Sequence, residues 1–310
     1  MAIRTYSSLS FIALLFVILM PFSFEAHSEF DNKAHLAIVY DGKSLQPKVR
    51  AIYADIVTGI RHGFGSSSVI EVNNGEIHGW SANSVIMLGN YVVREALAAN
   101  NNLNMVVGAV SWVSETVHGI HITVDPALVF ETVAELVPTV SEVFIILDAN
   151  SRLLDISHLV ASGEQQGINV RAILASDIKD AASIYSRLSI GLNPQHAFWI
   201  PPGDRFVNKA LLSTLLLRSW QSGFAVISSN PSHVSKGALF ALSPDYYLMG
   251  VRLGELAVKV SENPTMTAKM WPLRDVKLNI NQRMANHMGI KIHSDIRQKS
   301  LDRSIQLQVQ

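Results

Sequence analysis

The chain has 310 residues, enough for two domains of ordinary size, and 48% of them are hydrophobic, which excludes an intrinsically disordered protein. Lysine plus arginine and aspartate plus glutamate both number 25, so the charge balance does not indicate a nucleic-acid-binding protein. No cysteine is present, which excludes disulfide bonds, thiolate metal ligands and cysteine nucleophiles. Such a chain must be stabilised by a large apolar core.

Residues 1–28 have the pattern of a secretory signal peptide. Arg4 precedes an unbroken apolar segment, Phe11–Met20, and Ala26-His27-Ser28 places small residues at the ends of a cleavage motif. The apolar segment is short for a transmembrane span, although flanking residues could extend it into a retained anchor helix. We expect export to the periplasm and cleavage after residue 28.

Apolar runs that end in turn residues follow the leader. Leu36–Tyr40 is a strand pattern that ends at Asp41-Gly42, and Val49–Phe64 repeats apolar residues at helical spacing. Three further strand patterns complete this series: Val69–Val72, Val85–Leu88 and Met105–Val110. Strands that alternate with helices predict a parallel sheet covered by helices.

A second series of the same kind follows a polar connection, His118–Val124, and a helix that Asp125-Pro126 opens. Its predicted strands are Val143–Leu147, Asn169–Leu174, Ala197–Ile200 and Phe224–Ile227. Its predicted helices are Leu153–Gln165, Ile178–Leu188 and one for which Asp204 is the expected N-cap. The fold class is therefore α/β, with two doubly wound parallel-sheet lobes joined by short crossings.

The last segment has a different pattern. Gly237–Leu242 is apolar, Tyr246–Val260 predicts a helix, and Pro264 with Pro272 indicates a linker. Val276–Ile280 then alternates like a strand. We expect the polar tail, residues 294–310, to be loosely held.

Three motifs stand in order in this segment. They are Gly237-Ala238-Leu239, then Asp245-Tyr246-Tyr247 with Gly250, then Leu278-Asn279 with Ala285, Gly289 and Ile290. In this arrangement the chain resembles the substrate-binding proteins of ABC importers, of the tryptophan/tyrosine-binding kind. The likeness covers about Leu36 to Ile292, and its most specific part is the last fifty residues.

The resemblance implies a type 1 periplasmic-binding fold that closes on a ligand between its lobes. It implies a first lobe of residues 29–120 and 239–270, and a second lobe of residues 121–238 and 271–293. The implied function is capture of a small molecule, by family default an aromatic amino acid, for an ABC permease. We expect a monomer with no cofactor and no nucleic-acid partner. The alternative is a ligand-sensing or envelope-system module on the same fold, acting with a membrane sensor instead of an importer.

Candidate ligand-binding residues follow the predicted strands, where ligands of open α/β sheets bind. In the first lobe they are Tyr40, Asp41, Gly89, Asn90, Ser111 and Trp112. In the second lobe they are Asn150, Ser151, Gly203, Asp204, Ser228 and Asn230, and Asp245 is the candidate in the segment that returns to the first lobe. Each could instead serve its own turn, helix cap or core. The carboxylates of Asp204 and Asp245 suit a ligand amine or an N-cap, and the aromatic rings suit stacking or packing.

Three of these positions depart from the family pattern. Gly89-Asn90 replaces the usual Gly-Thr, Ser111-Trp112-Val113 replaces Ser-Asp-Pro, and Ala149-Asn150 replaces Asn-Pro. These changes affect the expected ligand contacts and leave the expected fold unaltered.

Signals of catalysis are weak. No Gly-x-Ser-x-Gly motif occurs, and Gly63-Phe64-Gly65 follows a helix rather than the strand that a dinucleotide loop requires. The pair His118 and His121 has no acidic neighbour at a spacing that suits zinc. We therefore predict that the protein is not an enzyme and holds no metal.

Overall fold

The computed structural model describes residues 36–43, 46–65, 69–72, 84–99, 105–112, 116–151, 153–292 and 305–309. All of them belong to one of the chain's two compact units, residues 33–310. The predicted signal peptide lies outside the described residues. Within the described ranges, no helix combines the length and apolar character that a membrane span requires.

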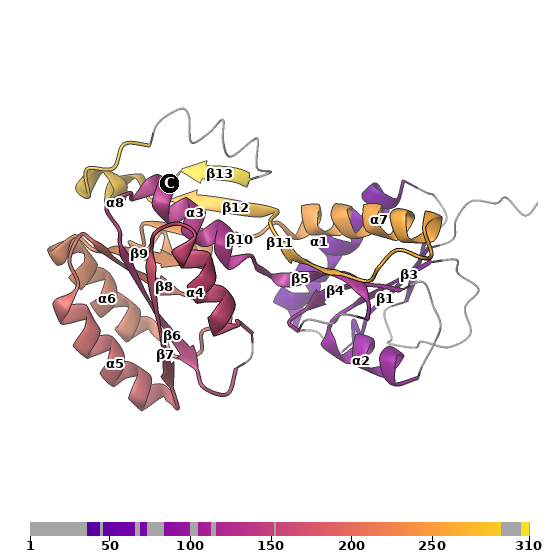
Figure 1. The fold of residues 1–310 in the computed structure, drawn as a ribbon, viewed down its shortest axis with the longest axis horizontal. Coiled ribbons are helices and arrows are strands. Elements are labelled where there is room, and N and C mark those ends of the chain that lie inside the picture. The colour runs from indigo at the N-terminus through magenta and orange to yellow at the C-terminus, as the bar shows by residue number, and fades with distance from the viewer. Residues whose placement is uncertain are drawn as a thin grey trace, which may run out of the picture. The chain divides into compact units, whose positions relative to one another are not determined.

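The first lobe is built on a six-stranded sheet in the order β11-β5-β4-β3-β1-β2, in which every pair is parallel (Figure 1). The strands are β1 Leu36–Val39, β2 Val69–Val72, β3 Ser84–Leu88, β4 Met105–Val110, β5 His118–Val124 and β11 Met270–Leu273. The helices are α1 Pro47–Phe64, α2 Asn90–Ala98 and α7 Tyr246–Glu262. The four strands expected in the first series are confirmed.

Two strands of this sheet were expected to be connections. The segment His118–Val124, expected as a polar connection, is β5, and the expected linker between Pro264 and Pro272 contains most of β11. The imidazole of His118 stacks on the indole of Trp271, with 6.2 Å between ring centroids. The polar residues of β5 weaken the apolar pattern that predicts a strand, and this contact between β5 and β11 stabilises the strand in the folded chain. Pro272 is tolerated because β11 is at the sheet edge.

The second lobe is built on a seven-stranded sheet in the order β13-β12-β10-β9-β8-β6-β7. The strands are β6 Glu142–Asp148, β7 Asn169–Ala175, β8 His196–Ile200, β9 Ala225–Ser228, β10 Phe240–Pro244, β12 Val276–Ile280 and β13 Ile305–Val309. Only the pair β10 and β12 is antiparallel within this described sheet. The predictions for β6 to β9 and for β12 are confirmed.

The tail contains regular structure that was not expected. Residues Ile305–Val309 form β13, which runs parallel to β12 and pairs with it along five residues, Val276↔Ile305 to Ile280↔Val309. Leu307 packs against the apolar core. The alternation of apolar and polar residues in this short strand was the available signal.

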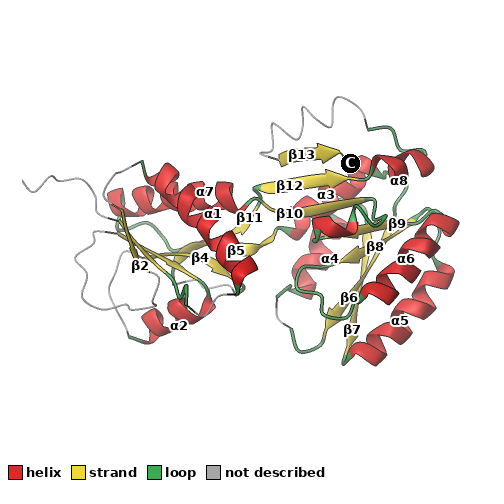
Figure 2. Cartoon of the chain, turned by 180° about the vertical axis from the view of Figure 1, so that it is seen from behind, coloured by secondary structure: helices red, strands yellow, loops and turns green. Residues whose placement is uncertain are grey.

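Helical segments lie on both faces of the second sheet (Figure 2). They are α3 Pro126–Leu136, α4 Ile156–Glu164, α5 Ile178–Gly191, α6 Lys209–Ser222, the 3₁₀ turn η1 Pro231–His233 and α8 Gln282–His287. The N-cap of α6 is Asn208, whose side chain accepts a hydrogen bond from the amide of Leu211. The prediction that Asp204 caps this helix is therefore wrong.

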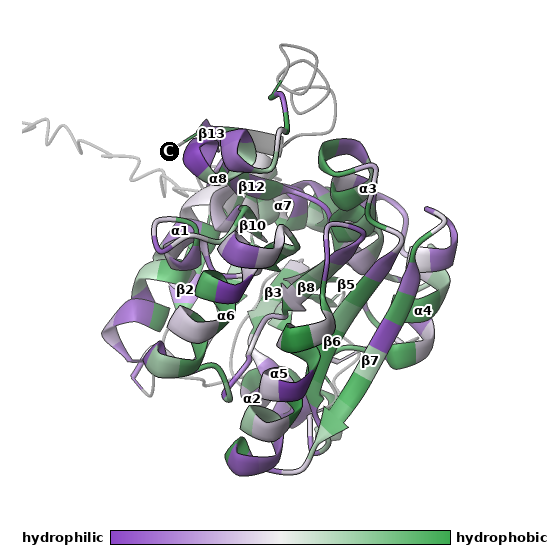
Figure 3. Cartoon of the chain, turned by 90° about the vertical axis from the view of Figure 1, so that its left-hand side faces the viewer, coloured by the Kyte–Doolittle hydropathy of each residue, from purple (hydrophilic) through white to green (hydrophobic). Residues whose placement is uncertain are grey.

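Each sheet carries an apolar core on both faces. In the second lobe, one core packs under α3 and α4 around Trp199 and the other under α5 and α6 around Phe198. Figure 3 shows apolar residues along nearly all of β6, whereas α5 and α6 each carry apolar and polar residues. A strand buried on both faces has this continuous apolar pattern, which explains why it was predictable.

The lobe boundaries expected from the resemblance differ from the sheet membership at three places. Strand β5 extends the first lobe through Val124, beyond residue 120. Strand β10, residues 240–244, belongs to the second sheet because it pairs with β9. The chain passes back to the first lobe after this strand. Strand β11, residues 270–273, pairs with β5 in the first sheet.

Candidate ligand-binding site

The first-lobe candidates lie at the carboxyl ends of three neighbouring strands, β1, β3 and β4. The amide group of Asn90 donates to Ser111 Oγ over 2.9 Å, and the Ser111 backbone N–H donates to Asn90 Oδ1 over 3.0 Å. Asn90 is the first residue of α2, beside the free N–H groups of the helix. The two residues thus form a polar pair at this edge, with the donors of a helix N-terminus next to it.

Gly89 connects β3 to α2 with a backbone φ of 93°, a conformation that residues with a side chain rarely adopt. A Cβ atom there would lie 2.5 Å from the hydroxyl oxygen of Tyr53. The position therefore accepts only glycine because of both its backbone angle and its neighbour.

The aromatic candidates of this lobe contact the protein itself. Tyr40 is buried, its ring lies 5.6 Å from the ring of Tyr53, and its hydroxyl donates to Glu71 Oε1 over 2.5 Å. Trp112 packs against the apolar core beside β3 and β4, and its buried indole N–H has no hydrogen-bond partner in the described part of the chain. Asp41 follows Tyr40 and is partly exposed.

The Tyr40 contact predicts a pH-dependent contribution to stability. Burial, followed by the hydrogen bond to Glu71, raises the pKa of Tyr40 from 10.0 to about 12. The folded chain therefore holds this proton more tightly than the unfolded chain, and the stabilisation is complete below pH 10 and is lost as the pH rises toward 12. In denaturant unfolding, Tyr40→Phe should lose less stability across this pH interval than the wild type.

Tyr91→Phe is the matched control for this measurement, because the side chain of Tyr91 is 64% exposed. This variant keeps the contact between Tyr40 and Glu71, so its loss of stability across this pH interval should match that of the wild type. An equal alkaline loss of stability in the wild type and Tyr40→Phe would contradict the assignment.

In the second lobe, a cavity of about 400 Å³ lies at the carboxyl ends of β8 and β9. Its walls come from the end of β5, the loop after β8, the loop after β9, and the junction between β10 and α7. The first and last of these segments are two of the three places where the chain passes between the two sheets, and the third is the link from β11 to β12. The polar side chains that line it are those of Thr123, Asp204, Ser229, Asn230, His233 and Tyr246, and Gly203 lines it through its backbone.

Asp204 lies in this wall and holds its own loop in place. Its Oδ1 accepts the amides of Phe206 and Val207, over 2.6 and 3.0 Å, and its Oδ2 accepts the hydroxyl of Tyr185 over 3.1 Å. These contacts fix the orientation of a carboxylate at the cavity surface. Burial and the Asp204 charge both raise the pKa of Tyr185, which therefore remains a hydrogen-bond donor.

A second group of hydrogen bonds orders the loop after β9. Ser228 Oγ accepts the amide of Asn230 and contacts His233 Nδ1, 2.9 Å away. The buried indole of Trp199 donates to Ser229 Oγ over 3.2 Å. Burial and the nearby Lys236 lower the pKa of His233, which favours a neutral imidazole that can both donate and accept.

The remaining second-lobe candidates act mainly in local structure. The Asn150 amide donates to Asp148 Oδ1 and the Leu153 amide to Ser151 Oγ, so these residues close a turn. The Asn150 N–H and Arg205 together lower the pKa of the Asp148 carboxyl.

Asp245 is the N-cap of α7, which is one of the two roles expected for it. Its Oδ1 accepts the amide of Leu248, and Lys277 Nζ lies 3.8 Å from its buried Oδ2. It is not among the residues that line the cavity.

The structure therefore brings Gly203, Asp204 and Asn230 together in one cavity, and Asn90 with Ser111 in one pair. Sequence reasoning missed Thr123, Ser229, His233 and Tyr246. The available signals were the Asn-Pro-Ser-His sequence after β9, in which Asn230 caps η1, and the family motif that contains Tyr246. No group of three or more metal-ligating side chains occurs among the described residues.

The model of the family described as ABC transporter substrate binding protein matches residues 97–302, which is more than half of the chain. The chain belongs to this family. No curated protein matches it. The family match covers the whole seven-stranded sheet except for β13, and it includes every residue of the cavity.

Solved structures of substrate-binding proteins share the fold. A ligand-free, open substrate binding protein with adhesive properties from Clostridium difficile is 15% identical, covers 89% of this chain and 100% of its own, and has a TM-score of 0.63. An ABC domain in complex with L-Trp from Streptococcus pneumonia is 16% identical, covers 89% and 99%, and has a TM-score of 0.55. A LacI transcriptional regulator from Lactobacillus brevis, 12% identical over 77% and 98%, has a TM-score of 0.52. At these identities, the likeness shows the fold alone.

Proposed function

We propose that this member of the family captures a small solute in the cavity beside β8 and β9 and delivers it to an ABC importer without catalysing a reaction. The observation that carries the proposal is the cavity itself. Its volume of about 400 Å³ falls within the range of small-molecule sites, and polar side chains held by hydrogen bonds line it from the loops after β8 and β9. Thr123 and Tyr246 line it at two of the chain crossings. Family membership supports the same role.

An amino acid suits the chemistry of this wall. Asp204 offers an oriented carboxylate for an ammonium group, and Ile122, Pro201 and Tyr246 offer apolar surface for a side chain. Closure about the crossings would add the Asn90–Ser111 pair and the α2 N-terminus, which suit a carboxylate. An aromatic amino acid is the first ligand to test, because one solved relative of this fold is a complex with L-Trp.

The proposed location is the periplasm, with the protein acting as a monomer. The leader-like pattern of residues 1–28 and the absence of cysteine support the periplasmic location. A protein in this location could deliver its solute to a membrane permease.

A thermal-shift screen of the protein against amino acids and aromatic acids tests the proposal. A ligand at about 100 times its dissociation constant should stabilise the folded state by about 2.7 kcal/mol. Tryptophan, tyrosine or phenylalanine should produce this rise in melting temperature. If none of these compounds raises the melting temperature, the sensor or envelope-module alternative is favoured.

Thr123→Trp tests the position of the site. Thr123 lines the cavity and is half-buried, so an indole there would fill ligand space. We expect at least about a tenfold loss of affinity. Thr58→Trp, on the exposed face of α1, is the control and should bind as the wild type does. Equal affinity in both variants would contradict this position for the site.

A further inference from the structure

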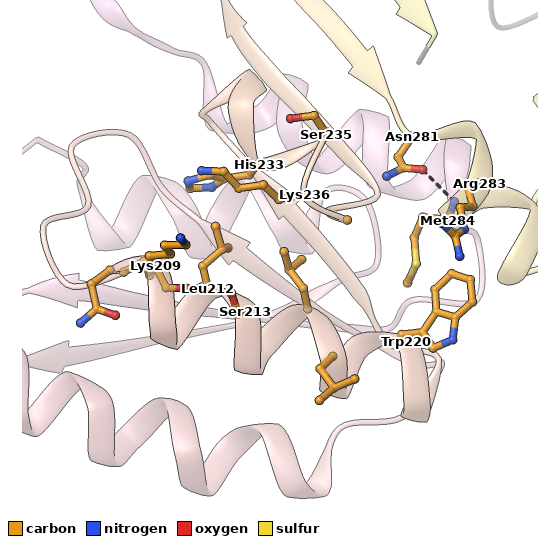
Figure 4. Close-up of a pocket in the computed structure, with 15 residues that line it drawn as sticks. Lys209, Leu212, Ser213, Trp220, His233, Ser235, Lys236, Asn281, Arg283 and Met284 are labelled. Carbon is orange, nitrogen blue, oxygen red and sulfur yellow. Dashed lines mark hydrogen bonds between the residues drawn. The ribbon is translucent and has the colours of Figure 1, made fainter.

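A larger cavity, of about 720 Å³, lies along α6 in the second lobe (Figure 4). Its walls are α6 on one side, and the loop after η1 and the first turn of α8 on the other. Val207 and His233 border both this cavity and the one proposed for the solute. The two spaces are adjacent, but most of their lining residues differ.

The permanently charged side chains that line this α6 groove are all cationic. The lining residues drawn in Figure 4 include Lys209, Lys236 and Arg283 and no carboxylate. In the described part of the chain, no carboxylate oxygen lies within 4.0 Å of the charged nitrogen atoms of these three side chains. Unpaired cations facing one concave space favour an anion.

The floor of the groove is apolar and elongated. Leu212 and Leu216 lie one helical turn apart on α6, and Met284 lines the same groove from α8. In Figure 4, Lys209 lies at one end near His233 and Lys236, and Trp220 lies at the other end near Arg283. From residue 209 to residue 220, α6 rises about 16 Å at about 1.5 Å per residue.

The indole at the far end is held in place although it is 39% exposed. The His287 imidazole stacks on it with ring centroids 3.6 Å apart and an interplanar angle of 7°, and the Arg283 guanidinium lies 5.4 Å from its centroid. A fixed, partly exposed aromatic ring at the end of an apolar groove is suited to contact a ligand.

We propose that this α6 groove is a second binding site, for an elongated anionic amphiphile with a carboxylate or phosphate headgroup and an acyl chain. The headgroup contacts the ammonium groups of Lys209 and Lys236. The chain lies along Leu212 and Leu216 toward Trp220. The length of the groove, its single charge sign and its apolar floor together select this class of ligand.

Calorimetry with decanoate, below its micellar concentration, tests the proposal on the full chain. We expect one decanoate per chain and at least about tenfold weaker binding of uncharged decanamide. Lys236→Met keeps the length of the side chain and removes its charge, and it should weaken decanoate binding about tenfold through loss of a charge-assisted hydrogen bond. Lys179→Met, at an exposed position of α5, is the matched control and should bind as the wild type does.

Two further variants separate this site from the solute cavity and from nonspecific adsorption. Trp220→Ala should weaken decanoate binding and leave the solute site intact, since Trp220 does not line that cavity. Thr123→Trp should leave decanoate binding intact even where it abolishes solute binding, so the two proposals can fail independently. The proposal would be overturned by equal binding of decanoate and decanamide, or by a loss of affinity in Lys179→Met equal to that in Lys236→Met. It would also be overturned if no decanoate bound at about 1 mM, or if the protein bound only to anionic phospholipid vesicles.

Discussion

Replacing Gly250 with alanine should lower the free energy of unfolding by about 3 kcal/mol. Helices α1 and α7 pack backbone to backbone at this point. A Cβ atom on residue 250 would lie 2.1 Å from the carbonyl oxygen of Ile56 and 3.0 Å from the Cα of Gly59. Because both atoms belong to the backbone, a rotamer change cannot relieve the overlap, and the two helices must separate.

Gly191→Ala is the matched control for this substitution. Gly191 is the last residue of α5, and a Cβ atom added there would meet no described atom within 4 Å. Glycine costs up to about 1 kcal/mol relative to alanine within a helix, so this change should be neutral or slightly stabilising. Urea unfolding followed by circular dichroism measures both variants. Equal stability of Gly250→Ala and Gly191→Ala would contradict the close helix contact.

Trp199→Ala should lower the free energy of unfolding by about 3–5 kcal/mol, the range for loss of a buried large aromatic side chain. Trp199 is 1% exposed on β8, and its ring meets Phe130 edge-on with 5.7 Å between centroids. Its indole also donates to Ser229 in the cavity wall. The substitution removes core volume and leaves the loop after β9 without one of its anchors.

Trp199→Phe separates these two effects, because it keeps most of the apolar volume and loses the hydrogen bond to Ser229. It should cost less stability than the alanine variant and should still weaken solute binding. Trp220→Ala is the comparison for stability, since the Trp220 indole is 39% exposed and should contribute less than the indole of Trp199, which is 1% exposed. Denaturant unfolding that ranked Trp220→Ala as the more damaging change would contradict the central place of Trp199 in the core.

The parts of the fold that were predictable are those whose burial is evident locally. Strands such as β6 and β8 are buried on both faces and therefore form continuous apolar runs between turn residues. Strand β5 was missed because its histidines look polar in sequence, and only the partner β11, far along the chain, buries one of them against Trp271. Sheet order around β10 likewise depends on pairing that local pattern does not contain.

The sequence indicates the position of the candidate site more clearly than its detailed contacts. The rule that ligands bind at carboxyl edges located Asn90 with Ser111 and Asp204 with Asn230. Asp204 does not have its predicted role as the N-cap of α6, because Asn208, further along the same loop, caps this helix. His233 was missed because its contacts with Ser228 and its position between two cavities arise from the packing of η1 against the sheet.

Native mass spectrometry of the protein after incubation with a small-metabolite extract tests the central claim, that a solute occupies the cavity beside β8 and β9. We predict one additional small-molecule mass per chain in the wild type and in Thr58→Trp, and loss of that mass in Thr123→Trp. A solute mass retained unchanged in Thr123→Trp, or no bound molecule in any of the three proteins, would contradict it.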